Sequence, residues 1–230
     1  MWTFRPNQLR KARKLAGLTQ QRAAAQLRVS QAYLAMIESG RRRVTDPLAS
    51  RIAKLYRLPP TALPLDAGDA VARDSANIAK AVANLGYPGF RHLRGGRTMN
   101  PAAALLAAIS SDDLEVRVVE SLPWVAIEHH DLDWVWLVCQ AKLHNAQNRL
   151  GFLVTLSRRV AEKSDATAAF GTLCTVQEVL ERARLAHEDT LCQQSLSEAE
   201  RRWLRKARPA DAQHWNLLTD LSAEVLPYAA

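Results

Sequence analysis

The sequence contains little cysteine and no long apolar run. Its three cysteines, Cys139, Cys174 and Cys192, are odd in number and none has a CxxC partner. Neither a disulfide framework nor a structural zinc site is therefore indicated. The apolar run from Trp134 to Cys139 is far shorter than the roughly 20 residues that cross a bilayer. Because no basic stretch followed by an apolar block opens the chain, we expect a cytoplasmic protein.

Glycine, proline and strand patterns are also scarce. The 230 residues include 9 Gly and 10 Pro, and no stretch alternates between apolar and polar side chains as a half-exposed strand does. With 48% hydrophobic and 23% charged residues, the composition is typical of a folded globular protein. We therefore predict an all-α protein, and the length favours two domains over one.

Acidic residues are almost missing from the first 65 positions. This part carries 13 Lys and Arg against Glu38 and Asp46, a net charge of +11, whereas the rest has a net charge of −3. Such a local positive charge attracts a polyanion through phosphate contacts and the release of counterions. Charge alone would equally fit DNA, RNA or an acidic lipid surface.

The N-terminal part has the periodicity and capping residues of four short helices. Gly17 and Gly40 are placed to end the first and third helices, Thr19 and Ser30 to cap the second and third, and Pro47 to start the fourth. The residues expected in its core are Leu9, Ala12, Leu15, Ala16, Ala23, Ala24, Leu27, Val29, Ile37, Leu48, Ile52 and Leu55.

The chain is expected to divide into an N-terminal domain at residues 1–66, a connector at 67–99 with some helix of its own, and a helical domain at 100–230. Ser111 before two aspartates, and Ser197 with Glu200 as a capping box, are start signals for helices in the last part. The helices predicted there lie near residues 101–109, 112–121, 123–129, 133–142, 145–162, 166–187, 197–207 and 211–225.

One motif in the N-terminal domain points to a family. Its residues are Leu18, Thr19, Gln20, Ala24, Val29, Ser30, Gln31, Ile37, Glu38 and Gly40. In type and spacing they resemble the Cro/C1 or XRE family of helix-turn-helix regulators. The resemblance implies a lambda-repressor-like domain whose helix beginning at Ser30 enters the major groove of duplex DNA. A small residue at position 24 lets the two helices approach each other closely.

The resemblance also assigns roles to single residues. Gln20 would hold a phosphate at the start of its helix, and Gln31 would read the N6 and N7 edge of adenine. Ala32 or Met36 would pack on a thymine methyl group, while Tyr33 faces either the bases or the DNA backbone. The candidate DNA-binding residues are Gln20, Ser30, Gln31, Ala32, Tyr33, Met36, Arg41, Arg42 and Arg43, of which the three arginines would contact phosphates.

The sequence departs from the family pattern at two positions. Many members carry glycine where this chain has Arg28, so this arginine must either adopt a left-handed conformation or shift the turn. A larger hydrophobic residue is usual where Ala23 stands, which suggests looser packing.

Enzymatic readings are weaker, and we expect no catalytic residue, metal site or cofactor. The densest polar cluster of the second domain consists of Glu128, His129, His130, Asp131 and Asp133. Its adjacent histidines point to different sides of a helix, so we interpret the cluster as a solvated helix end. Cys139 with His144 lacks a third orienting residue, and Gly95 with Gly96 follows no strand that would make a phosphate-binding loop.

Two functional hypotheses remain open. In the first, the protein is a dimeric repressor that reads a palindromic operator, because two heads are needed for half-sites about 34 Å apart. The apolar segment from Leu132 to Val160 would then serve dimerisation or the binding of a protein partner. In the second, the protein is an antitoxin or inhibitory partner of a toxin or enzyme, and its helix-turn-helix domain autoregulates the operon.

Overall fold

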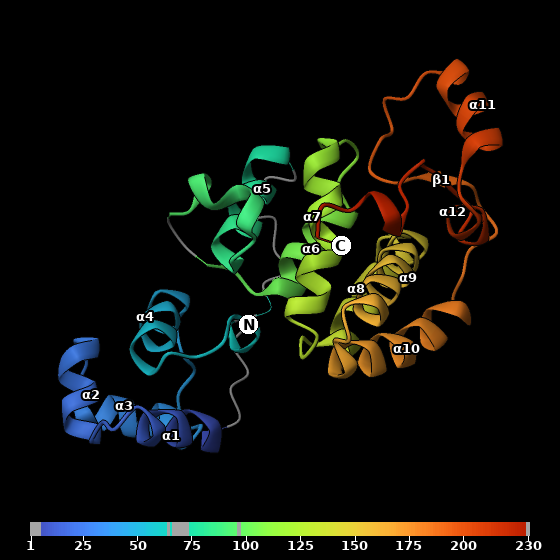
Figure 1. Ribbon diagram of the computed structural model, residues 1–230. Helices are drawn as coiled ribbons and strands as arrows, with labels where there is room; N and C mark the ends of the chain where they lie inside the picture. The colour runs from blue at the N-terminus through green and yellow to red at the C-terminus, as the bar shows by residue number, and fades with distance from the viewer. Residues whose placement is uncertain (1–5, 64, 66–73, 96–97, 229–230) are drawn as a thin grey trace. The chain divides into compact units, whose positions relative to one another are not determined.

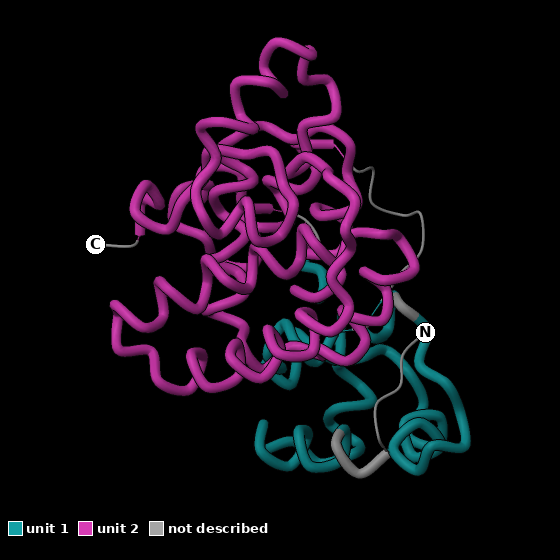
Figure 2. The backbone as a smooth tube through the Cα atoms, turned by 90° about the vertical axis from the view of Figure 1, so that its right-hand side faces the viewer, with its two compact units in different colours: residues 1–66, 97–100 teal, residues 67–96, 101–230 magenta. Residues whose placement is uncertain are grey.

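The computed structural model describes residues 6–63, 65, 74–95 and 98–228, and these residues form an all-α protein, as predicted (Figure 1). The chain divides into two compact units, residues 1–66 with 97–100 and residues 67–96 with 101–230 (Figure 2). Within the described ranges, no helix combines the length and the apolar character that a membrane span requires.

The N-terminal unit consists of four helices. They are α1 (Pro6–Leu15), α2 (Gln20–Leu27), α3 (Gln31–Glu38) and α4 (Asp46–Tyr56), followed by the short 3₁₀ helix η1 (Pro60–Ala62). Gly17 and Gly40, which follow α1 and α3, both have a positive φ, of 69° and 76°. This is the left-handed conformation that glycine adopts without a steric penalty at helix ends.

Of the side chains predicted in the core of this unit, all except Leu15 are buried or half-buried, and Leu34 and Tyr56 add to them. Its buried side chains are Leu9, Ala23, Ala24, Leu27, Leu34, Ile37, Leu48, Ile52 and Tyr56. The prediction for Leu15 was wrong, because this side chain is 80% exposed. The inward face of α1 instead follows Leu9, Ala12, Arg13 and Ala16, a spacing of three and four residues that turns Leu15 outward.

The second unit is a larger helical assembly. Its elements are α5 (Ser75–Leu85), η2 (Pro88–Leu93), α6 (Pro101–Ile109), α7 (Val116–Glu128), α8 (Trp134–Leu143), α9 (Gln147–Lys163), α10 (Thr167–Glu181), α11 (Glu198–Ala207), α12 (Ala210–His214) and η3 (Ala223–Val225). Of the stretch expected as a connector, α5 and η2 belong to this unit, and α5 packs on α6 and α7.

Helix α9 lies at the centre of the second unit. It contacts α7, α8, α10 and α12, and residues 147–156 are buried without interruption. A helix that is enclosed on all sides needs small residues where a neighbour comes close. Gly151 provides such a position: the fully buried ring of Trp215 packs against it and donates a hydrogen bond of 2.8 Å to the hydroxyl of Thr155.

Several predicted helices of this unit have different bounds in the structure. The predicted helices 112–121 and 123–129 form one helix, α7, which continues through Pro123. Its packing on α9 outweighs the hydrogen bond that a proline in a helix interior lacks. The expected start at Asp112 is wrong because Asp113 accepts hydrogen bonds from the backbone and hydroxyl of Ser195 instead. The helix predicted at 166–187 ends at Glu181.

The C-terminal part contains a strand pair that the sequence did not predict. The helix expected at 211–225 ends as α12 at His214, and the chain then forms β2 (Leu217–Leu218), which pairs in parallel with β1 (Asp189–Thr190). Each strand has only two residues, which is too short to show an alternating pattern of apolar and polar side chains. The capping box of Ser197 and Glu200 at the start of α11 is confirmed.

Candidate nucleic-acid interface

The turn between α2 and α3 is held by side-chain caps and by one left-handed residue. The hydroxyl of Thr19 accepts a hydrogen bond of 3.2 Å from the backbone of Arg22, and that of Ser30 accepts one of 3.1 Å from the backbone of Tyr33. Arg28 has φ 54° and ψ 48°. Of the two alternatives for this residue, the structure therefore shows the left-handed one, and the turn keeps its length.

Close packing of α2 against α3 fixes the angle between them. Ala23 and Ala24 are buried at this contact, together with Leu27 and Ile37. Two small side chains on α2 allow the helix backbones to approach, so the pair behaves as one rigid element. Ala23 itself is fully enclosed, with an exposed fraction of 0%.

A buried ion pair connects α1 to the end of α3. The guanidinium of Arg13 donates two hydrogen bonds to the carboxylate of Glu38, of 2.6 and 3.1 Å, and a third of 2.8 Å to the carbonyl of Leu18. Both side chains are more than nine-tenths buried. The hydrogen bonds to Glu38 raise the pKa of Arg13. This pair fixes α3 against α1 and sets the direction in which the Glu38 carboxylate points.

The same carboxylate orients the two glutamines of the motif. Gln20, the first residue of α2, donates a hydrogen bond of 3.1 Å from its Nε2 to Glu38. Its Oε1 accepts a hydrogen bond of 3.4 Å from Nε2 of Gln31, the first residue of α3. A chain of contacts thus runs from the buried Arg13 to the exposed Gln31, and it orients the side-chain amide of Gln31 before any ligand is present.

The other residues predicted at the interface differ in exposure. Ser30, Gln31, Ala32 and Met36 are exposed on α3, with Met36 at 38%. Tyr33 is half-buried against the core of the unit, which restricts it more than its neighbours. Ser30 caps this eight-residue helix, Gln31 lies in its first turn, and Ala32 and Met36, four residues apart, lie on one side of it.

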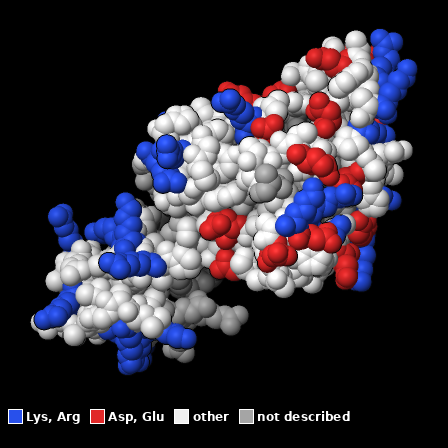
Figure 3. Space-filling model, viewed as in Figure 1, with Lys and Arg blue, Asp and Glu red and all other residues white. Residues whose placement is uncertain are grey.

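The three arginines after α3 are exposed and their backbone returns over the end of that helix. The amides of Arg41 and Arg42 both donate to the carbonyl of Met36, at 2.9 and 3.2 Å. Arg43 is exposed as well. In the view of Figure 3, the surface formed by α1 to α4 displays Lys and Arg side chains and no acidic ones. Because Glu38 is neutralised by Arg13, the surface around α3 has a positive potential that suits phosphate groups.

Sequence reasoning included Glu38 in the family motif without assigning it a role, and it did not identify Arg13. A signal was available for Arg13, since it lies four residues after Leu9 and three before Ala16, on the inward face of α1. A charged residue at such a position needs a buried partner of opposite sign. Glu38 and Asp46 are the two acidic residues among the first 65, so few partners were possible.

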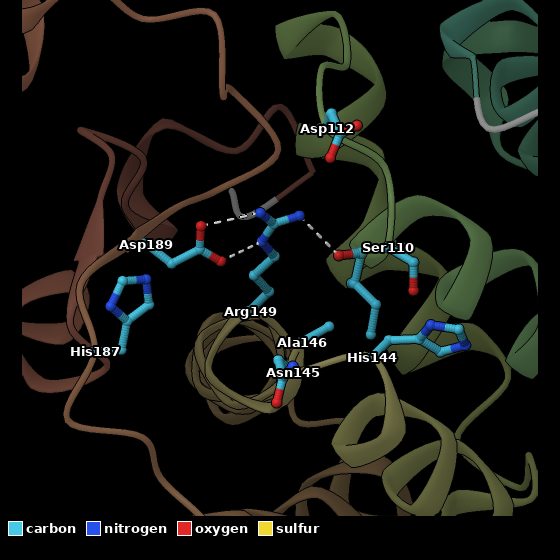
Figure 4. A pocket seen from close by; sticks show the side chains of 9 residues that line it. Ser110, Asp112, His144, Asn145, Ala146, Arg149, His187 and Asp189 are labelled. Carbon is cyan, nitrogen blue, oxygen red and sulfur yellow. Dashed lines mark hydrogen bonds and ion pairs between the residues drawn. The ribbon is translucent and has the colours of Figure 1, made fainter.

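The second unit contains a polar pocket of about 270 Å³ at the start of α9 (Figure 4). The buried guanidinium of Arg149 lies in its wall, paired with Asp189 at 2.6 and 3.0 Å, and it also donates to the carbonyls of Ile109 and Ser111. Burial alone would raise the pKa of Asp189. Hydrogen bonds from Arg149, from the backbone of Thr190 and from the side chain of Gln194 lower it instead. This ion pair holds α6, α9 and β1 together.

The polar cluster at the end of α7 is only partly the solvated helix end that we predicted. His129 is buried, its Nε2 lies 3.3 Å from the carbonyl of Leu85, and burial lowers its pKa. Asp133 is exposed and caps α8 by accepting a hydrogen bond of 2.9 Å from the backbone of Trp136. Among the residues that the structure places, no three His, Cys, Asp or Glu side chains are grouped as a metal site would require.

Comparison with known proteins agrees with this geometry in the N-terminal unit. A family model described as helix-turn-helix matches residues 9–63, which include α1 to α4. Neither a curated protein nor a solved structure matches the chain. The matched family is a DNA-binding regulatory domain and has no catalytic role. The N-terminal unit is therefore a helix-turn-helix domain of the XRE type, and this domain supports a DNA-binding regulatory role for the chain.

Proposed function

We propose that this regulator is a dimeric, sequence-specific transcriptional repressor that reads duplex DNA with the first two turns of α3. The observation that carries the proposal is the chain of contacts from Arg13 through Glu38 and Gln20 to Gln31. An exposed glutamine that is oriented in advance loses less side-chain entropy when it forms paired hydrogen bonds with adenine. Specificity for a base edge requires this orientation, whereas general attraction to phosphates does not.

The proposal separates residues that read bases from residues that hold the backbone. Gln31 reads adenine, and Ala32 and Met36 give it an apolar neighbourhood suited to the methyl group of thymine. Gln20 and the arginines at positions 41–43 contact phosphates, and Ser30 fixes the start of the reading helix through its cap. Tyr33 adds a contact to the sugar-phosphate backbone from its half-buried position.

Repression follows from occupancy of the operator by two heads. One head with eight residues of reading helix covers a few base pairs, and two heads on half-sites about one turn of DNA apart cover enough to distinguish an operator from the genome. The second unit supplies the contact between the two copies. A repressor of this kind needs no chemistry of its own, since it acts by excluding polymerase.

The test uses the full chain and an operator selected from random duplexes. Gln31→Ala should weaken operator binding by about 1–3 kcal/mol, and its loss on random DNA should be much smaller. Gln26→Ala changes an exposed glutamine on α2 and serves as the matched control, with unchanged affinity. Equal losses on operator and random DNA for Gln31→Ala would overturn the assigned role.

The phosphate contacts are tested by the salt dependence of binding. Arg42→Ala should weaken the binding of all sequences alike and reduce the slope of log affinity against log salt concentration by about 1. Arg117→Ala removes an exposed arginine of α7 in the second unit and should leave the slope unchanged. If both variants give the same slope as the wild type, Arg42 makes no phosphate contact.

A further inference from the structure

Helix α8 presents an apolar face to solvent in the second unit. Val135 is 83% exposed and Leu143 is 71% exposed, and the exposed Cys139 lies midway between them. The spacing of four residues places all three on one side of the helix. The opposite side is buried in the unit through Trp134, Leu137, Val138 and Ala141. Exposed aliphatic side chains are common singly, but a row of them along one helix marks an interaction surface.

We propose that this face, formed by Val135, Cys139 and Leu143, is where a second copy of the chain binds through an antiparallel α8 to α8 contact about a two-fold axis at Cys139. This inference names the surface behind the dimer of the proposed function and so rests on that function for its purpose. An isologous contact needs one self-complementary patch, because the same residues meet from both sides.

The charges at the two ends of α8 favour an antiparallel second copy. Asp133 is exposed at the start of α8, while Lys142 is exposed near its end. In an antiparallel pair the acidic end of each copy lies beside the basic end of the other, and the helix dipoles oppose each other favourably. A parallel pair would bring like charges together at both ends. The middle of the face carries no charge that would oppose burial.

The register follows from the spacing of the side chains. With Cys139 on the axis, Val135 of one copy meets Leu143 of the other, since both are four residues from the centre, or about 6 Å along the helix. Trp136, which is half-buried, and Lys142, which is exposed, flank the face on its two sides. Each side chain of the face thereby finds a partner of suitable chemistry.

The size of the face sets the strength of the contact. A standard protein interface buries roughly 800 Å² on each partner, and one side of a ten-residue helix provides less. We therefore infer a reversible dimer that forms at micromolar concentration. Binding of two heads to adjacent half-sites on DNA would add to its stability.

The geometry allows a direct chemical test of the two-fold axis. Helix axes 8–10 Å apart bring facing Cα atoms to within about 4–6 Å of each other, a range that a disulfide spans. Dithiodipyridine would join two Cys139 thiols by accepting their two electrons and two protons as two pyridine thiones. Cys192 cannot compete, because burial raises the pKa of its thiol to about 11.

The first measurement is sedimentation velocity of the full chain under reducing conditions, from about 1 to 200 μM. The wild type should change from monomer to dimer within this range, and Val135→Asp should remain a monomer. The variant is expected to fold, because an acidic residue in the first turn suits the helix dipole. Val225→Asp alters an exposed valine outside this face and should dimerise as the wild type does. Circular dichroism checks the fold of both variants.

The second measurement is cross-linking with dithiodipyridine. Wild type and Cys174→Ser should give a covalent dimer, and Cys139→Ser should give none. A wild type that is monomeric at all concentrations, dimerisation of Val135→Asp equal to that of the wild type, or a cross-link through Cys174 would each overturn the inference. Failure of the proposed function looks different: the chain would dimerise and cross-link as described, yet would bind operator and random DNA equally.

Discussion

The substitution Glu38→Gln tests whether the buried ion pair holds the reading helix in place. The change keeps the size of the side chain and removes its charge. The side chain of Arg13 is 8% exposed, and its guanidinium then faces an amide that can accept a hydrogen bond at one atom only. The introduced amide nitrogen also points toward the Nε2 donor of Gln20, so the bond of 3.1 Å between Gln20 and Glu38 is lost. Removing the charge of one partner in a buried ion pair typically lowers the free energy of unfolding by about 3–5 kcal/mol.

Hydrogen exchange in the full chain measures this loss in the N-terminal unit alone. Peptides from α1 to α3 should exchange at least about 100-fold faster in Glu38→Gln than in the wild type, since each 1.4 kcal/mol is roughly a factor of ten. Peptides from α9, in the other unit, should be unchanged. Glu198→Gln removes the carboxylate of an exposed pair with Arg205, and it should change exchange in α11 by less than about fivefold.

A double substitution separates stability from recognition. Arg13→Met with Glu38→Leu removes both charges and fills the same space, so protection should return close to that of the wild type. Gln20 still lacks its acceptor, and discrimination by Gln31 between operator and random DNA should remain reduced. Exchange in Glu38→Gln within threefold of the wild type would refute the reasoning, as would full discrimination by the double variant.

Three further predictions concern single positions. Arg28→Gly should stabilise the N-terminal unit by about 0.5–1 kcal/mol in chemical unfolding, because glycine tolerates the left-handed conformation of this residue. Burial raises the pKa of Tyr56 from 10.0 to about 12, so this unit should lose stability as the pH rises through that interval, and subtraction of Tyr56→Phe from an absorbance titration should show one tyrosine titrating near 12. A Cβ at Gly151 would lie 2.3 Å from the ring of Trp215, so Gly151→Ala should destabilise the second unit by about 1–3 kcal/mol in thermal unfolding. Gly171 has open space around it, so Gly171→Ala should stabilise the same unit by about 0.5–1 kcal/mol, and a shift of the opposite sign in either variant would contradict the assignment of that glycine.

The N-terminal unit was predictable because its determinants are local. Caps at Thr19 and Ser30, and the glycines that end α1 and α3, act within one turn of the residue that carries them. The family resemblance then related these signals to a known arrangement of helices. Leu15 was misplaced because a short helix offers two overlapping three-and-four spacings, and a charged residue, Arg13, occupies the one that is buried.

The second unit was less predictable because tertiary contacts decide where its helices begin and end. Pro123 normally ends a helix, yet burial against α9 carries α7 through it. Asp112 and Asp113 have the composition of a helix start, but Ser195, 82 residues later, donates a backbone hydrogen bond to Asp113. The strand pair of 189–190 with 217–218 likewise joins distant residues. None of these partners is visible in a local window of sequence.

The site was predictable in its exposed part and not in its support. The chemistry of Gln31 and the arginines after α3 can be read from the motif, since it depends on side chains that face outward. What fixes the direction of Gln31 is a contact of residues 13, 20, 31 and 38 from three helices. Spacing along the chain does not reveal such a contact, because each pair is set by how the helices pack.

The two proposals assign affinity and specificity to different parts of the chain. Linking two weak heads through a dimer converts the second binding event into an intramolecular one, which raises overall affinity by roughly 10²- to 10⁴-fold without a new base contact. Loss of the α8 face should therefore weaken a full operator strongly and leave the binding of a single half-site unchanged. Loss of the Gln31 contact should reduce discrimination on both and leave the dimer intact. Because the Arg13 to Gln31 chain lies entirely within one head and the α8 face entirely within the other unit, a variant of one should combine with a variant of the other additively in free energy. A marked departure from additivity would mean that the two units communicate.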